Sequence, residues 1–142
     1  MPRSMTPNEF IDSLHKAETG EEIIYHIGCL AYDRDIAARQ TRESALIETC
    51  ATMAWKVAAP QLFEIGSKAD HLSCAGWGIA TMAQRKIPVR PLENPTYAYL
   101  IRMKRSLTIE EADHLRAFGL KLRDHNLAVW KSIKASPTGK AA

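Results

Sequence analysis

Long apolar runs are absent from this sequence of 142 residues. None approaches the roughly 18 to 20 residues that a helix needs to cross a bilayer. The first ten residues, MPRSMTPNEF, also lack the apolar centre of a secretory signal. Cysteine is scarce: Cys29, Cys50 and Cys74 are dispersed and form no CxxC pair, which is typical of reduced thiols. We therefore expect a cytoplasmic protein without a disulfide framework and without a membrane partner.

Motifs of catalysis are absent as well. The sequence has no Gly-rich phosphate loop, no HExxH, no nucleophile elbow and no zinc-type cysteine spacing. His71 and Cys74 are three positions apart, but two ligands do not make a structural zinc site. In the triplet Asp33-Arg34-Asp35, acids at the first turn of a helix beside a paired arginine are a simpler interpretation than an active site. We expect no enzymatic activity, no bound metal and no cofactor.

The composition is that of one ordinary globular domain. Apolar residues make up 46% and charged residues 25% of a chain that is long enough to bury a core without covalent cross-links. The two ends have little to pack against. We therefore expect a flexible N-terminus over residues 1–5, a single domain over 6–134 and a disordered tail over 135–142.

Two capping boxes predict the first and last helices. Thr6 and Glu9 open a short helix that we expect Gly20 to end. Thr108 and Glu111 open a long amphipathic helix that runs to about residue 133.

The middle of the chain predicts a buried helix followed by two short ones. Residues 33–59 contain neither proline nor glycine, and their apolar residues recur at spacings of three and four. This indicates one helix, or two helices that break near Thr41. Short helices around 60–65 and 67–75 then complete a helix-turn-helix order, although 67–75 fits a loop equally well.

Strands are predicted on either side of a proline-rich turn. Residues 79–87 and 97–105 are rich in β-branched and aromatic side chains and should pair antiparallel. The period of two gives the second arm one face to bury. That face carries Tyr97, Tyr99, Ile101 and Met103. The run EEIIYHI at 21–27, which Gly28 ends, is expected to add a third strand.

The predicted hairpin is the most basic stretch of the chain. Residues 84–105 carry six cations against one acid, whereas residues 8–35 carry seven acids against two cations, so we expect two electrically distinct ends. A cationic strand edge can simply prevent aggregation between sheet edges, or it can bind an acidic protein. Guanidinium groups also bind phosphate bidentately, which makes nucleic acid another possible partner. The residues predicted to contact nucleic acid are Arg85, Lys86, Arg90, Arg102, Lys104 and Arg105, supported by Gln84, Lys68, Arg39 and Arg42.

Three segments resemble a group of small uncharacterised proteins from temperate phages and prophages. They are GEEIIYHIGCLAYDR at 20–34, the pair Ala54-Trp55, and 82–105, which begins MAQRK and ends YAYLIRMKR. In that group the pattern is a YHxGxLAxDR strand-to-helix corner, a buried Ala-Trp and a basic QRR hairpin that returns as YLAxRR. This chain has Lys86 where arginine is usual. The resemblance implies a phage origin and a small regulatory or host-interacting role.

Together these features predict a mainly α domain with a small antiparallel β-sheet, an α+β fold of winged helix-turn-helix type. The leading hypothesis is a non-enzymatic regulator that binds double-stranded DNA, with the hairpin on the backbone and 67–75 nearest the bases. The alternative is a phage factor that binds and inhibits a host nucleic-acid-handling enzyme or defence system, its acidic N-terminal half mimicking nucleic acid. An uncharacterised enzyme is the third alternative. The long C-terminal helix could also pair with its copy in a homodimer.

Overall fold

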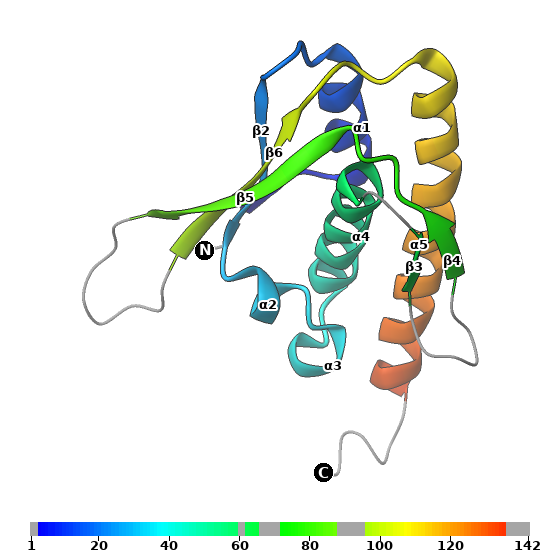
Figure 1. Cartoon of the computed structure of the whole chain (residues 1–142). Coiled ribbons are helices and arrows are strands. Elements are labelled where there is room, and N and C mark those ends of the chain that lie inside the picture. The colour runs from blue at the N-terminus through cyan, green and yellow to red at the C-terminus, as the bar shows by residue number, and fades with distance from the viewer. Residues whose placement is uncertain (1–2, 60–61, 66–71, 88–95, 136–142) are drawn as a thin grey trace.

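The computed structural model describes residues 3–59, 62–65, 72–87 and 96–135 (Figure 1). In chain order its elements are β1 (Arg3–Ser4), α1 (Pro7–Lys16), β2 (Glu22–Gly28), α2 (Leu30–Asp33), α3 (Ile36–Arg39), α4 (Arg42–Ala58), β3 (Leu62–Ile65), β4 (Leu72–Ala75), β5 (Ala80–Ile87), β6 (Thr96–Met103) and α5 (Ile109–Ala135). The fold is therefore mixed α+β.

The main sheet is antiparallel, with the strand order β1-β2-β6-β5. β5 pairs with β6 from Ala80 opposite Met103 to Ile87 opposite Thr96, so the predicted hairpin is confirmed. β2 pairs with the other side of β6, which confirms the predicted third strand. The hairpin extends away from the helices, and β5 forms one edge of the sheet (Figure 1).

Part of the segment expected to be flexible, residues 1–5, pairs with the edge of the sheet. β1 pairs with β2, placing Arg3 opposite Ile27, and the Met5 N–H donates to the Tyr25 carbonyl at 3.0 Å. Residues 3–5 are thus held by backbone hydrogen bonds, because β2 offers them an open edge. Residues 1–2 and the predicted tail from 136 onward lie outside the described residues.

The predicted starts of the first and last helices are confirmed. In α1 the Glu9 N–H donates to Thr6 Oγ1 at 3.2 Å and the Thr6 N–H donates to Glu9 Oε1 at 2.9 Å. At the start of α5 the Glu111 N–H donates to Thr108 Oγ1 at 3.1 Å and the Thr108 N–H donates to Glu111 Oε1 at 2.9 Å. α1 ends at Lys16, earlier than predicted. Although α5 has 27 residues, neither it nor another helix of the described ranges is long and apolar enough to cross a bilayer.

The middle helical segment breaks where the sequence predicts. Gln40 has a left-handed φ of 52° and ends α3. Thr41 then caps α4, its Oγ1 accepting the Ser44 N–H at 3.1 Å. The segment expected over 33–59 therefore contains the short helix α3 followed by the long helix α4. The left-handed conformation of Gln40 separates the two helices.

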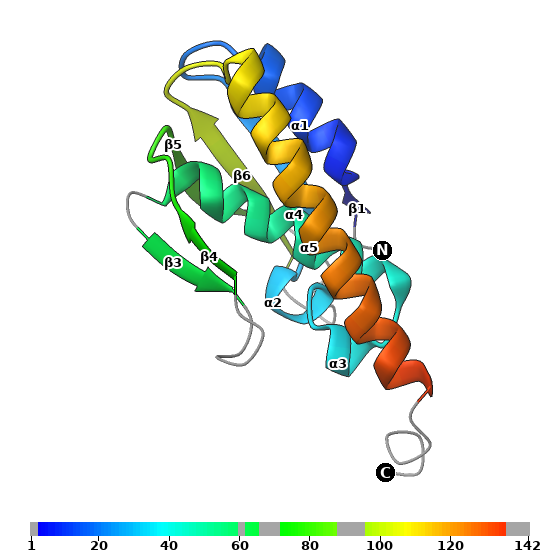
Figure 2. The same ribbon diagram turned by 90° about the vertical axis from the view of Figure 1, so that its right-hand side faces the viewer.

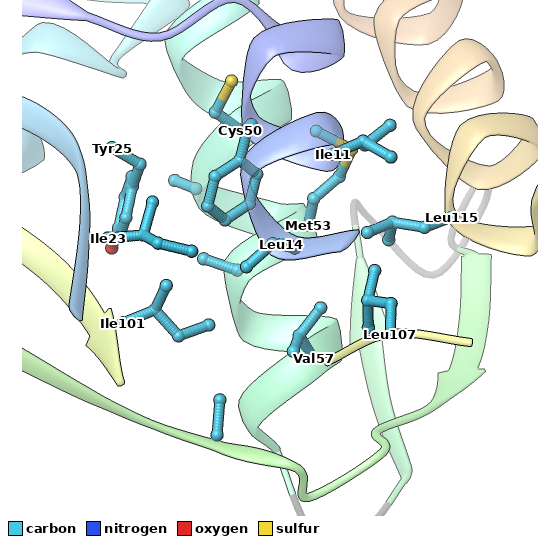
Figure 3. Close-up of a cluster of buried hydrophobic side chains, with 14 of the residues drawn as sticks. Ile11, Leu14, Ile23, Tyr25, Cys50, Met53, Val57, Ile101, Leu107 and Leu115 are labelled. Carbon is cyan, nitrogen blue, oxygen red and sulfur yellow. The ribbon is translucent and has the colours of Figure 1, made fainter. Parts of the chain in front are cut away.

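Helices α1, α4 and α5 lie on one face of the sheet, and α4 runs between the sheet and α5 (Figures 1 and 2). Figure 3 shows the core that results, in which side chains from all three helices meet those of the sheet. Ile11 and Leu14 of α1, Met53 of α4 and Leu115 of α5 are each 1% exposed or less, as is Ile101 of β6. We call this helix-covered face of the sheet the front face and the opposite one the back face.

The two short helices predicted at 60–65 and 67–75 are wrong. β3 and β4 form a two-stranded hairpin instead, with Leu62 opposite Ala75 and Ile65 opposite Leu72. The apolar residues of so short a run fit both periods, and one isolated helical turn has few internal hydrogen bonds to stabilise it. Residues 66–71, which include Lys68 and His71, lie outside the described residues.

The entry into β5 is tied to the end of α4. The N–H groups of Trp77, Gly78 and Ile79 donate to carbonyls of the last turn of α4 and of Ala59, at 2.8 to 3.1 Å. A β-carbon on Gly76 would stand only 2.0 Å from the Ala59 oxygen, so only glycine fits there. These bonds satisfy carbonyls that a helix end otherwise leaves unpaired, and they fix β5 relative to α4.

Candidate functional site

The pairing of β5 with β6 divides the predicted basic cluster between two faces. Gln84 and Lys86 lie opposite Tyr99 and Tyr97, on the front face of the sheet. Arg85 lies opposite Ala98 and therefore on the back face, because neighbouring residues of a strand alternate between faces. The cations of the hairpin are thus not arranged as one patch.

On the back face two of the predicted arginines share one carboxylate. Glu22 of β2 accepts from Arg102 at 2.6 Å and from Arg85 at 3.1 Å. These hydrogen bonds, the one from Arg102 first, lower the pKa of Glu22. The acidic and basic stretches of the sequence therefore lie side by side in the sheet. The expectation of two electrically distinct ends is wrong, because β2 pairs directly with β6.

The remaining hairpin cations are also largely engaged. Arg105 donates to both oxygens of Glu111 at 2.6 and 2.7 Å, and Lys104 donates to the Gly78 carbonyl at 3.3 Å. Lys86 is exposed and has no acidic partner among the described residues. Arg90 lies in 88–95, outside the described residues.

Arg39 and Arg42 lie at the α3–α4 turn, which Figure 1 places away from the hairpin. The Arg39 guanidinium stacks 4.7 Å from the centre of the Tyr32 ring. Arg42 is the first residue of α4 and is exposed. Neither therefore adds to a surface formed by the hairpin cations.

The outer face of α4, which points away from the sheet, is covered by α5 (Figure 2). The residues on that face, Ala45, Thr49, Thr52 and Lys56, are all at most 6% exposed. Thr49 Oγ1 accepts from Asn126 of α5 at 3.0 Å, and Lys56 Nζ lies 4.8 Å from the centre of the Phe118 ring. At the start of α4, Trp130 Nε1 donates to the Gln40 carbonyl at 3.1 Å. α5 thus covers the outer face of α4.

Beside this contact α4 borders an open groove of about 670 Å³, here called the α4 groove. Its walls come from β2, α2, α3, α4, β5 and the second half of α5. Most of its lining is apolar, including Leu30, Ile36, Ala51, Trp55, Met82 and Val129. A cleft of this volume falls in the size range of binding sites.

Several polar side chains of the α4 groove are already hydrogen-bonded within the protein. Arg34 Nε donates to the two oxygens of Glu48 at 3.1 and 3.3 Å, and Thr52 Oγ1 donates to Glu48 at 3.1 Å. Asn126 is engaged with Thr49, as described above. Burial raises the pKa of Tyr25, another lining residue, to about 12, so its hydroxyl stays protonated. Apart from Asp35 and His125, which also line it, the groove therefore offers a partner mainly apolar contacts.

Two large apolar side chains stand exposed at the groove. Trp55 of α4 is 48% exposed and Met82 of β5 is 37% exposed, and both line the cavity. The resemblance noted in the sequence implied a buried Ala-Trp pair, and only Ala54, at 0% exposure, fits it. The sequence analysis assigned no binding role to Trp55 or Met82. The available signal was that Trp55 lies outside the apolar stripe of its helix.

One wall of the groove is held by a buried corner between β2 and α2. His26 Nε2 lies 2.8 Å from Asp33 Oδ2, which also accepts the Cys29 N–H at 3.0 Å. The Leu30 N–H donates to the Tyr99 hydroxyl at 3.1 Å. His26 and Asp33 are 1% and 5% exposed. They belong to the YHIGCLAYDR segment, and their contacts hold α2 against the sheet.

The described residues contain no group of three or more His, Cys, Asp and Glu side chains placed to hold a metal ion. Comparison of the chain with protein-family models, curated proteins and solved structures gave no match.

Proposed function

We propose that this chain is a non-enzymatic binding protein, that its partner is another protein, and that the α4 groove is its binding surface. The observation that carries this proposal is the exposure of Trp55 and Met82 at the edge of a mainly apolar cleft. Exposed large apolar side chains gathered at a concave site mark interaction surfaces more often than scattered ones do.

The chemistry of the groove favours apolar side chains of a partner. Its ion pair between Arg34 and Glu48 is satisfied internally, so a charged ligand would have to break existing bonds. Tryptophan is the residue type most enriched among those that dominate binding energy, and methionine adapts to varied partners. A partner that inserts one or two apolar side chains beside Trp55 fits these features.

The scaffold supports the same proposal. We infer a winged-helix arrangement, because the order α1-β2-α2-α3-α4-β5-β6, interrupted by the β3–β4 hairpin between α4 and β5, with β6 between β2 and β5 is the connectivity of that fold. In this arrangement α3 and α4 supply the helix-turn-helix and β5–β6 the wing. The helix that reads DNA in such folds corresponds to α4, whose outer face is closed by α5. Protein binding is therefore favoured over DNA reading, and a host protein is the first candidate partner.

The test is a comparison of binding by wild type, Trp55→Ala and a matched control, Ile109→Ala. Ile109 is 70% exposed at the start of α5 and does not line the groove. Partners would be enriched from a host extract, purified and titrated. We expect Trp55→Ala to weaken binding by about 2 kcal/mol, roughly 30-fold, while Ile109→Ala binds as wild type. Equal affinities for Trp55→Ala and wild type would contradict the proposal.

DNA binding through the wing is the second candidate function, and the exposed front face of the hairpin favours it. Lys86 and Gln84 lie there next to Tyr97. The pairs of Arg85 and Arg102 with Glu22 are exposed and therefore weak, so phosphate can compete for these arginines, and we expect contacts to the DNA backbone. Replacing Lys86 by Ala should flatten the dependence of log K on log salt by about 0.9. A mobility shift with duplex DNA at several salt concentrations measures this salt dependence directly. A complete lack of affinity for DNA at low salt would exclude DNA binding through the wing.

A further inference from the structure

A second cavity, of about 220 Å³, lies where the first turn of α1 and the start of α4 meet the middle of α5. We call it the arginine cavity, because Arg42, Arg116 and Arg123 line it. Its α4 residues, Arg42 and Leu46, lie on the side of the helix opposite to Ala51 and Trp55 of the α4 groove. The two sites are therefore separate.

The lining of the arginine cavity contains three cations and no carboxylate. Nearby acids compensate part of this charge from outside: Arg116 lies 3.0 Å from Asp12 and 3.5 Å from Asp113, and Arg123 lies 3.8 Å from Asp124. All three aspartates are more than half exposed, at 58%, 71% and 74%. Exposed pairs of this kind are weak, so an anion in the cavity can compete for the guanidinium groups.

The placement of two of these arginines has no evident stabilising role. Arg42 has no acidic partner among the described residues. It also opens α4, where the helix dipole disfavours a cation. The Arg123 Nε–H is closed off from solvent, and the described residues offer it no acceptor. A bound oxyanion would stabilise Arg42 and could supply the acceptor that Arg123 lacks.

The apolar residues of the lining suggest which chemical group is attached to the bound anion. Ile11, Leu46 and Leu120 give the cavity an apolar side, and Leu120 is 51% exposed. We propose that the arginine cavity binds the phosphate group of a small phosphorylated molecule, with a compact apolar group resting on Leu46 and Leu120. Phosphate fits better than carboxylate, because its doubly charged tetrahedral group accepts from several guanidinium forks at once.

The phosphate group that binds in the arginine cavity could also belong to a nucleic-acid backbone. The cavity favours the small molecule, because it is small, at about 220 Å³, bordered by three helices and partly apolar. The probes are therefore phenyl phosphate, inorganic phosphate, phenol and a short DNA duplex, all at one ionic strength. The measurement is calorimetric titration, supported by the shift in melting temperature that a ligand specific to the folded state produces.

The variant is Arg42→Gln/Arg123→Gln, and its matched control is Arg85→Gln/Lys86→Gln, which removes the same number of charges from the hairpin. We expect wild type and control to bind phenyl phosphate saturably, inorganic phosphate more weakly and phenol not at all. The cavity variant should bind phenyl phosphate at least about tenfold more weakly. Arg42→Gln alone changes only an exposed residue, so it gives the same test, with a smaller loss, if the double variant does not fold.

Equal binding of phenyl phosphate by the cavity variant and the control would overturn the proposal, as would no binding by the wild type. Displacement of phenyl phosphate by duplex DNA, together with loss of DNA affinity in the cavity variant alone, would overturn the small-molecule source. Neither result depends on the α4 groove, since Trp55→Ala should leave phosphate binding unchanged.

Discussion

Gly119 of α5 lies directly against Met53 of α4, so closely that a β-carbon at position 119 would stand 2.7 Å from the Met53 sulfur. Met53 is fully buried, at 0% exposure, so its side chain could shift only within the packed core. The missing side chain therefore lets the two helices cross closely. This crossing seats α5 on the outer face of α4 and separates the α4 groove from the arginine cavity.

Replacing Gly119 by Leu should destabilise the protein. Forcing a side chain into a packed contact costs typically 1–3 kcal/mol, offset in part by the roughly 1 kcal/mol that glycine costs within a helix. We expect a net loss of about 1–2 kcal/mol in the free energy of unfolding, measured by urea denaturation. Leu120→Ala, at the exposed next position, should stay within about 0.5 kcal/mol of wild type. An undiminished free energy of unfolding in Gly119→Leu would mean that the helices do not cross so closely.

Removing the buried carboxylate of Asp33 should lower the free energy of unfolding more than removing the exposed carboxylate of Asp35. Asp33→Ala leaves His26 Nε2 and the Cys29 N–H without their acceptor in a buried corner. We expect a loss of about 3 kcal/mol, since each unpaired buried group costs about 1–3 kcal/mol. The control is Asp35→Ala, which removes only the cap of α3 and should cost about 1 kcal/mol. Similar losses in the two variants would show that the corner is not a structural anchor.

The start of α5 should make stability depend on pH in the acid range. The hydrogen bond from Arg105, followed by that from Thr108, lowers the pKa of Glu111 from 4.5 to about 2. Because the folded state favours the carboxylate, the stabilisation is complete above pH 4.5 and is lost as the pH falls toward 2. Glu111→Gln should lower stability at neutral pH and reduce its change across this range, whereas Glu110→Gln should do neither. Chemical denaturation at a series of pH values measures both effects, and parallel curves for wild type and Glu111→Gln would disprove this linkage.

The thiol of Cys50 should be unreactive in the folded protein. It is 1% exposed, and burial raises its pKa to about 12, so little thiolate exists at neutral pH. In a Cys29→Ser/Cys74→Ser variant, a thiol reagent at about pH 8 should react only after denaturant is added. Stoichiometric reaction in native buffer would contradict the buried position of this thiol.

Local signals of the sequence predicted much of the fold correctly. The capping residues Thr6 and Thr108 mark their helices. The period of two in 97–105 correctly placed Ile101 and Met103 in the core, but Ala98 and Leu100 on the opposite face of β6 are buried as well. These features depend on neighbours in the chain, so a single sequence displays them. The helices predicted around 60–75 failed because a short apolar run fits a strand as well as a helix.

The candidate site could not be predicted in the same way. The period of two in the predicted strand already separates Arg85 from Lys86, but the pairing of Glu22 with two arginines depends on which strand is central. The α4 groove depends on how α5 crosses α4, which is decided by packing at Gly119 rather than by a motif. A count of charges along the chain could not show these relationships.

Site-specific photo-crosslinking tests the proposed binding surface most directly. A benzophenone amino acid would replace Met82 in the α4 groove, Lys86 on the wing or Ile109 at the start of α5, in cells that contain the candidate partners. We expect a discrete protein adduct at position 82 that is lost when Trp55→Ala is added, and no such adduct at position 109. Adducts to nucleic acid at position 86, with none to protein at position 82, would contradict protein binding through the α4 groove and favour DNA binding by the wing.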